Sequence, residues 1–94
     1  MVEITVNDFL KLCHPNVIDI RSVEKFNDNH IPGALNINAN LLLTDPSKYL
    51  NLDTVYYIYC QKGISSRTLA QILMMKGYKV YSIIGGYEAW LLNF

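Results

Sequence analysis

A single cysteine at the end of an apolar run is the residue of this chain best placed to do chemistry. The run Val55–Tyr59 leads directly into Cys60, and a helical pattern starts at Ser66 or Arg67. A helix that begins there, capped by Ser65 or Ser66, would turn unpaired backbone N–H groups toward the sulfur. Such donors favour the thiolate, which is the nucleophilic form of cysteine, and they also bind anions. The residues of the loop itself are Cys60, Gln61, Lys62, Gly63, Ile64 and Ser65.

A cysteine at a strand end can also be a plain packed side chain. The loop favours a chemical role, because Gly63 permits a close backbone approach while Lys62 and Ser65 add a charge and a hydroxyl. No histidine lies beside Cys60 in the sequence, so a protease-like cysteine–histidine pair has no local support. The site therefore suits a nucleophile that is already a thiolate and attacks an anionic or soft electrophile.

Asp19 and Arg21 lie near the end of another predicted strand, residues 17–20. Ligands of open α/β sheets bind outside the carboxyl ends of the strands, so we expect this pair close to the Cys60 loop. The two side chains can form a bracket that ties loops together, or Arg21 can contact a ligand directly. Arg67 falls in the first turn of the predicted helix, where the dipole disfavours a cation, so we expect it to pair with a carboxylate such as Asp19.

Length and composition predict one globular domain over residues 1–94, with 51% hydrophobic and 17% charged residues. Lys+Arg and Asp+Glu both number 8, and this zero net charge gives no electrostatic reason to expect nucleic acid or an anionic membrane as a partner. No apolar stretch approaches the ~18 residues of a membrane span, and the first residues lack the features of a signal peptide. We therefore expect a cytoplasmic protein.

The remaining cysteine and the histidines do not predict a second site. Cys13 and Cys60 make no disulfide framework in that compartment, and with only two histidines the chain offers no four-ligand metal set, so neither a metal nor a cofactor is expected. Cys13 is expected to pack on the apolar face of a helix, with a resolving thiol for Cys60 as the alternative. His30 is expected to make a structural hydrogen bond, with a general base as the alternative.

Strand and helix signals alternate along the chain. The run 55–59 has no polar alternation, which is typical of a strand buried on both faces in a parallel sheet covered by helices. Together the signals predict a three-layer α/β domain. Strands are expected at residues 2–4, 17–20, 35–37, 55–59 and 80–84, and helices after Thr5, after Ser22, up to Lys76 and over 87–92, with short helical turns at 41–43 and 46–50.

Four segments resemble signatures of the rhodanese family, in the right order and over nearly the whole chain. They are residues 17–21 followed by Glu24 and Phe26, residues 30–37, residues 59–65 and residues 85–90. The resemblance implies a five-stranded parallel sheet with helices on both faces and an enzyme that transfers sulfane sulfur.

The resemblance also implies roles for the loop. Cys60 would attack the outer sulfur of a donor such as thiosulfate, release sulfite, and pass the sulfur of the resulting persulfide to a thiol or other thiophilic acceptor. The loop amides would stabilise the persulfide anion, and Lys62 and Ser65 would hold the charged end of the donor. Many family members carry arginine where this chain has Gln61 and Ser65, so a persulfide delivered by another protein is an alternative donor.

Three other functions remain open at this stage. A persulfide carrier or relay partner would load Cys60 with little turnover, and a non-catalytic interaction module would use the fold alone. A cysteine phosphatase or arsenate reductase needs Cys-x5-Arg, whereas Ser66 stands at that position here and Arg67 follows one residue later. The loop length therefore argues against phosphate chemistry.

Overall fold

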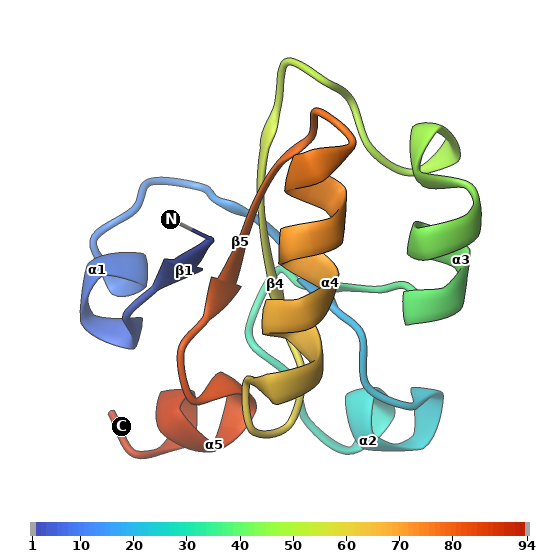
Figure 1. Ribbon diagram of the computed structural model, residues 1–94. Helices are drawn as coiled ribbons and strands as arrows, with labels where there is room; N and C mark the ends of the chain where they lie inside the picture. The colour runs from blue at the N-terminus through green and yellow to red at the C-terminus, as the bar shows by residue number, and fades with distance from the viewer. Residues whose placement is uncertain (1, 94) are drawn as a thin grey trace.

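The computed structural model describes residues 2–93, and their strands form one parallel sheet. The sheet has five strands in the order β1-β5-β4-β2-β3, and every neighbouring pair is parallel (Figure 1). This confirms the predicted five-stranded parallel sheet. The strands are β1 (Glu3–Ile4), β2 (Asn16–Asp19), β3 (Leu35–Asn36), β4 (Val55–Tyr59) and β5 (Lys79–Ile83).

Helices cover both faces of this sheet. The helices are α1 (Val6–Leu10), α2 (Val23–Asp28), α3 (Ala39–Thr44), α4 (Ile64–Met75) and α5 (Gly86–Leu91), with a 3-10 turn at Pro46–Lys48. Leu42 of α3 and Leu73 of α4 pack in one apolar cluster, while Phe9 of α1 and Trp90 of α5 pack in the other. The three predicted layers are therefore present, and α4 crosses in front of β4 in Figure 1.

The central strand β4 explains why the sequence shows no polar alternation there. Successive strand residues point to opposite faces, so Ile58 enters the cluster under α3 and α4 while Tyr59 enters the cluster under α1 and α5. Both side chains are fully buried. A strand covered on both sides needs apolar residues at every position.

Two helices, α1 and α2, start at the predicted capping residues. The Thr5 hydroxyl oxygen accepts a hydrogen bond from the Asp8 N–H at 3.1 Å, and Ser22 accepts one from the Lys25 N–H at 3.3 Å. These caps satisfy N–H groups that the first helical turn leaves without partners. They fix where α1 and α2 begin, and α2 thereby follows β2 at the carboxyl edge of the sheet.

Two expectations about helix boundaries are wrong. Helix α4 begins at Ile64, with Gly63 as its N-cap at φ +87°, and not at Ser66 or Arg67 after a serine cap. Helix α1 ends at Leu10, so Cys13 lies beyond the helix and is exposed instead of packed. No side-chain cap marks the start of α4 or the end of α1. The backbone conformation sets these two helix ends.

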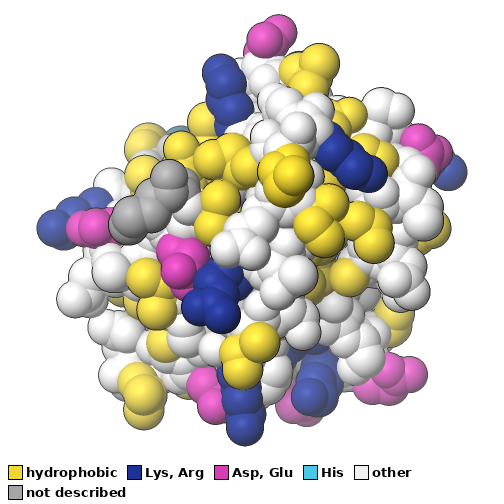
Figure 2. Space-filling model, in the orientation of Figure 1, with side chains coloured by type: hydrophobic (Ala, Val, Ile, Leu, Met, Phe, Trp, Pro, Cys, Tyr) yellow, Lys and Arg dark blue, Asp and Glu magenta, His cyan; other side chains and the backbone are white. Residues whose placement is uncertain are grey.

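Surface charge is dispersed on the face of the molecule seen in Figure 2. Acidic and basic side chains are scattered over this face, several of them beside a side chain of the opposite charge, and neither sign gathers into an extended patch. Among the helices of residues 2–93, none combines the length and the apolar character that crossing a membrane requires.

Candidate functional site

The carboxyl ends of two neighbouring parallel strands bring the predicted site residues together. Cys60 follows the last residue of β4, and its neighbour strand β2 ends at Asp19, which is in register with Tyr59. The loop after β4 lies between α2 and α5 in Figure 1. The expectation that Asp19 and Arg21 lie near the Cys60 loop is therefore confirmed.

The Cys60 sulfur sits in a ring of hydrogen-bond donors. The N–H groups of Gly63 and Ser66 donate to Sγ at 3.2 and 3.3 Å, and the Ser66 hydroxyl oxygen lies 3.4 Å from Sγ. The left-handed backbone at Gly63, immediately before α4, turns these amides inward. The first turn of α4 thus presents its unpaired donors to the sulfur, although it starts earlier than the sequence predicts.

These contacts lower the pKa of the Cys60 thiol. Burial alone would raise this pKa, but the Ser66 hydroxyl and the N–H groups of Ser66, Gly63 and Lys62 together outweigh the burial. Hydrogen bonds to the charged form make ionisation easier. The site therefore favours a thiolate through these hydrogen bonds, and no histidine is among the described residues that line the pocket beside the sulfur. His30 makes the expected structural contact, between its Nδ1 and the Phe26 carbonyl at 2.9 Å.

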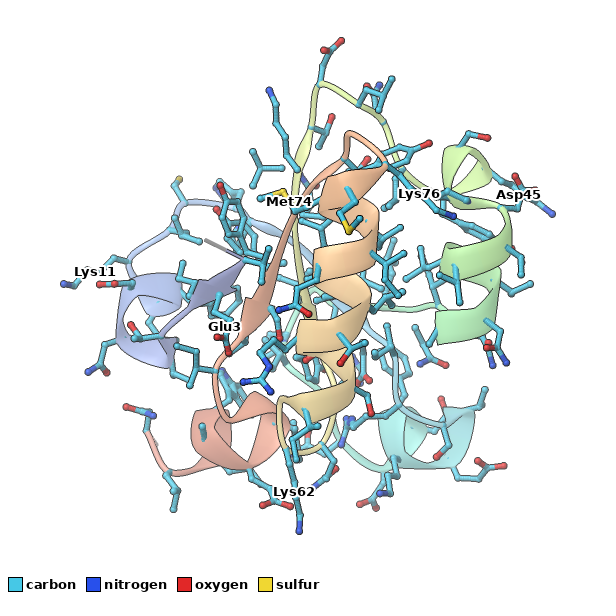
Figure 3. The ribbon with its side chains drawn as sticks, viewed as in Figure 1. Glu3, Lys11, Asp45, Lys62, Met74 and Lys76 are labelled. Carbon is cyan, nitrogen blue, oxygen red and sulfur yellow. The ribbon has the colours of Figure 1, made fainter. Side chains whose placement is uncertain are left out.

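A cationic pocket of about 670 Å³ opens beside the sulfur. It contains the side chains of three cations, Arg21, Lys25 and Lys62, and no carboxylate. Lys62 projects from the loop into open space (Figure 3). Such a pocket attracts a donor with an anionic end. The remaining lining residues are Ile20, Ser22, Ala39, Cys60, Gln61, Ile64 and Ser65.

Sequence reasoning missed Lys25. It lies in the first helical turn after the Ser22 cap, and α2 follows a strand that ends beside Cys60. A lysine at such a helix start has no signal of its own in the sequence. The combination of the Ser22 cap and the parallel order of β2 and β4 could have placed it at this edge.

Helix α5 holds the loop from behind through its backbone. The N–H groups of Tyr87 and Glu88 donate to the carbonyl oxygens of Cys60 and Gln61 at 2.9 and 3.1 Å. Gly86 makes this approach possible, because a Cβ at this residue would collide with the Cys60 carbonyl oxygen and the Gly63 nitrogen. Gly86, the first residue of α5, therefore allows the helix backbone to contact the loop.

Asp19 and Arg21 form a buried bracket, the first of the two interpretations that the sequence left open. Arg21 Nη2 lies 2.8 Å from Asp19 Oδ2, and the two side chains are 5% and 0% exposed. The Tyr59 hydroxyl donates to the same carboxylate at 2.7 Å, and Arg21 donates to the Gln61 side-chain oxygen at 3.3 Å. Burial would lower the pKa of Arg21, but Asp19 raises it through a hydrogen bond and its charge.

Gln61 continues this bracket to the other side of the loop. It accepts from Arg21 and donates to the Glu88 carboxylate at 3.3 Å. The guanidinium also lies over the Tyr87 ring, 3.9 Å from its centroid. Arg21 therefore connects the strand ends with α5, and its side chain still borders the pocket.

The expected pair between Arg67 and Asp19 is wrong. The Asp19 carboxylate is fully buried and is engaged by Arg21 and Tyr59, whereas Arg67 is exposed. Arg67 is also absent from the pocket lining. The helix starts at Ile64, so Arg67 lies nearly one turn into α4, where its side chain is exposed.

Cys13 cannot act as a resolving thiol for Cys60 in this fold. It precedes β2, Cys60 follows β4, and the two strands are parallel, so the thiols lie at opposite edges of the sheet. A disulfide requires Cα atoms within about 7 Å. Within residues 2–93, no group of three or more His, Cys, Asp or Glu side chains could hold a metal ion.

The fold and the cysteine loop define a parallel α/β protein with a thiolate site at the carboxyl edge of its sheet. Residues 5–93 match the Rhodanese-like domain family, and the chain belongs to that family. The resemblance noted in the sequence is thereby confirmed.

Curated relatives and solved structures agree with this membership. The chain is 40% identical to the thiosulfate sulfurtransferase GlpE of Shewanella oneidensis over 79% of its own length and 73% of the relative. It is 36% identical to GlpE of Coxiella burnetii over 79% of its own length and 69% of the relative. The crystal structure of SSP1007 from Staphylococcus saprophyticus is 30% identical, with a TM-score of 0.85 and 96% and 93% of the two chains covered.

Proposed function

We propose that this protein is a sulfurtransferase that moves sulfane sulfur from a donor to a thiophilic acceptor through a persulfide on Cys60. The observation that carries the proposal is the position of the Cys60 sulfur between the N–H groups of Gly63 and Ser66. Two relatives named as thiosulfate sulfurtransferases support it.

The reaction needs only the thiolate and fixed donors. The Cys60 thiolate attacks the outer sulfur of thiosulfate, the S–S bond of the donor breaks, and sulfite leaves with the bonding electron pair. An acceptor then attacks the outer sulfur of the persulfide, and Cys60 leaves as a thiolate. The loop amides, already aimed at Sγ, stabilise the negative charge in both steps. The cycle balances without a metal or cofactor.

The lysines of the pocket favour an anionic sulfur donor, and its volume leaves room for a donor larger than thiosulfate. Lys25 of α2, together with Lys62 and Ser65 of the loop, would hold the charged end. The volume of about 670 Å³ also accommodates a larger persulfide, including one presented by a protein. We therefore propose a small-molecule or protein sulfur donor and a thiol acceptor as partners, and neither nucleic acid nor a membrane.

A reducing compartment suits this chemistry. Cys13 and Cys60 are both free thiols, and the cytoplasm keeps such thiols reduced. We accordingly propose the cytoplasm as the place of action. Phosphate chemistry is disfavoured, because Arg67 does not line the pocket and so cannot clamp an oxyanion there.

Thiocyanate formation from thiosulfate and cyanide tests the proposal. The wild type is expected to turn over, Cys60→Ala is expected to be inactive, and Cys13→Ala serves as the matched thiol control with wild-type activity. The mass of the intact protein after exposure to thiosulfate or to a persulfide donor should increase by one sulfur atom, and only when Cys60 is present.

Two outcomes separate the alternatives. Loading of Cys60 from a persulfide donor with little thiocyanate formation would favour a carrier. If Cys60→Ala matches the wild type and no donor loads Cys60, the sulfurtransferase proposal is wrong, and an interaction module becomes the better explanation.

A further inference from the structure

Two buried hydroxyls lie in a row behind the Cys60 sulfur. Ser66 of α4 and Ser82 of β5 are both 0% exposed. Their hydroxyl oxygens are 2.7 Å apart, and Ser66 Oγ lies 3.4 Å from Cys60 Sγ. Cys60, Ser66 and Ser82 thus form a row of contacts from the pocket into the core. The proposed reaction uses Cys60 and gives Ser82 no role.

The protonation state of Cys60 determines which group donates in each of these two hydrogen bonds. A thiol can donate to Ser66, which then donates to Ser82. A thiolate has no proton and can only accept, so Ser66 must donate to Sγ. Within residues 2–93 the Ser82 hydroxyl has Ser66 as its only hydrogen-bond partner. In the thiolate form Ser82 therefore donates to Ser66, and both hydroxyl protons point along the row toward the sulfur.

We infer that Ser82 is a positioning residue for Cys60: it donates to Ser66 and aims the Ser66 hydroxyl at the thiolate. The inference rests on the proposed role of Cys60 as the nucleophile. A hydrogen bond donated to Ser66 polarises its hydroxyl and strengthens the contact with an anion more than the contact with a neutral thiol. Ser82 consequently stabilises Cys60 both as the attacking group and as the leaving group of the persulfide.

Other charges around Cys60 are independent of this pair. Arg21, Lys25 and Lys62 line the pocket, Glu88 contacts Gln61, and Asp19 is paired with Arg21. None of these side chains is hydrogen-bonded to the hydroxyl of Ser66 or Ser82, and within residues 2–93 these two hydroxyls contact Cys60 and each other. A substitution at Ser82 therefore leaves the charges in place, and a change in the titration of Cys60 reports on the row of contacts.

The pH dependence of alkylation measures this effect. In a Cys13→Ala background, iodoacetamide reacts with Cys60 alone, and the rate at each pH gives the pKa of the thiol. Ser66→Ala removes a donor to the thiolate and should raise this pKa by about one unit. Ser82→Ala removes only the polarisation and should raise it by about half a unit, which slows alkylation about threefold below the pKa.

The double variant carries the decisive prediction. Once Ser66 lacks its hydroxyl, Ser82 no longer reaches the sulfur, so Ser66→Ala/Ser82→Ala should titrate like Ser66→Ala alone. Ser82→Thr keeps the hydroxyl and should restore the parent pKa. Thr68→Ala, which removes an exposed hydroxyl from the same helix, should leave the pKa unchanged.

An unchanged pKa in Ser82→Ala, or full additivity in the double variant, would overturn the inference. Because alkylation needs no sulfur donor, the titration decides about Ser82 even if no donor loads Cys60. A failure of sulfur transfer would count against the proposed function alone.

Discussion

The backbone N–H of Tyr87 donates a 2.9 Å hydrogen bond to the carbonyl oxygen of Cys60. A helix near the end of the chain thereby determines the shape of a loop formed almost thirty residues earlier. The contact depends on a glycine at position 86. Gly86 has φ +60°, and a Cβ there would collide with the Cys60 carbonyl oxygen and the Gly63 nitrogen. The site is thus assembled by the packing of α5 and not by the loop sequence alone.

Gly86→Ala is expected to damage both stability and sulfur transfer. A positive φ costs a residue with a Cβ about 1 kcal/mol, and the collision with the loop adds about 2 kcal/mol. Urea unfolding should therefore show a loss of about 3 kcal/mol, and the Cys60 alkylation rate at neutral pH should fall as the amides shift.

Gly33→Ala is the matched control for this substitution. Gly33 also has a positive φ, +85°, but a Cβ there would have no atom within 4 Å. It should lose only the ~1 kcal/mol of the backbone term and keep its reactivity. Equal losses in the two variants would show that the contact between α5 and the loop is unimportant.

The buried bracket predicts strong coupling between Asp19 and Arg21. Asp19→Asn or Arg21→Met leaves a buried group without its charged partner and should cost about 3 kcal/mol or more. The double variant should cost clearly less than the sum of the two single variants, with a coupling of about 1 kcal/mol or more by urea unfolding.

Arg67→Met provides the contrast. Arg67 is exposed, and the Asp19 carboxylate is engaged by Arg21 and Tyr59, so the substitution of Arg67 should change stability by less than about 0.5 kcal/mol. Its effect should add to that of Asp19→Asn. Significant coupling of Arg67 with Asp19 would contradict the assignment of Arg21 as the partner.

Local patterns in the sequence predict much of this fold. Thr5 and Ser22 mark helix starts because their hydroxyls bond to N–H groups only three residues away. The run into Cys60 predicts a strand buried on both faces, and the order of strands and helices predicts the three layers. Cys60, Gly63 and Lys62 are predicted site residues because the chemistry is concentrated in one short loop.

Features that depend on distant contacts escape the sequence. Ser82 has the pattern of any small strand residue, and its hydroxyl becomes informative only because α4 places Ser66 against it. The sequence predicts both Arg21 and Arg67 as partners of Asp19, and only the Arg21 pair is present. A local rule about helix dipoles does not say which carboxylate the Arg67 side chain reaches. The sequence predicts a packed Cys13, but α1 ends at Leu10, earlier than the apolar residues indicate, and Cys13 is exposed.

The lowered pKa of Cys60 predicts that stability rises with pH up to about pH 8.5. Below the folded-state pKa, the thiol is protonated in both states and contributes nothing. Between that pKa and the unfolded value of about 8.5, only the folded state releases the proton, so the free energy of unfolding increases. Urea unfolding under reducing conditions from pH 5 to 9 should show this rise.

Cys60→Ser isolates this contribution from those of other titrating groups. The difference between the wild-type and variant curves should grow with pH through the window and level off above about 8.5. A pH-independent difference would mean that the hydrogen bonds around Sγ do not favour the thiolate.

The raised pKa of Tyr59 predicts that the free energy of unfolding falls with pH at higher pH. Burial, followed by the hydrogen bond to Asp19, raises the pKa of its phenol far above the usual value, and burial also raises the pKa of Tyr57. The unfolded chain ionises its tyrosines near pH 10, while the folded state keeps these protons. Stability is therefore fully present below about pH 10 and falls above it.

Tyr59→Phe should be less stable than the wild type at neutral pH, because the hydrogen bonds to Asp19 and from the Ile31 N–H are lost. Above pH 10 its unfolding free energy should fall less steeply, so the two curves converge. Parallel curves from pH 9 to 11 would show that the Tyr59 phenol ionises as readily in the folded protein as in the unfolded chain, and the buried contact of Tyr59 with Asp19 would then not hold its proton.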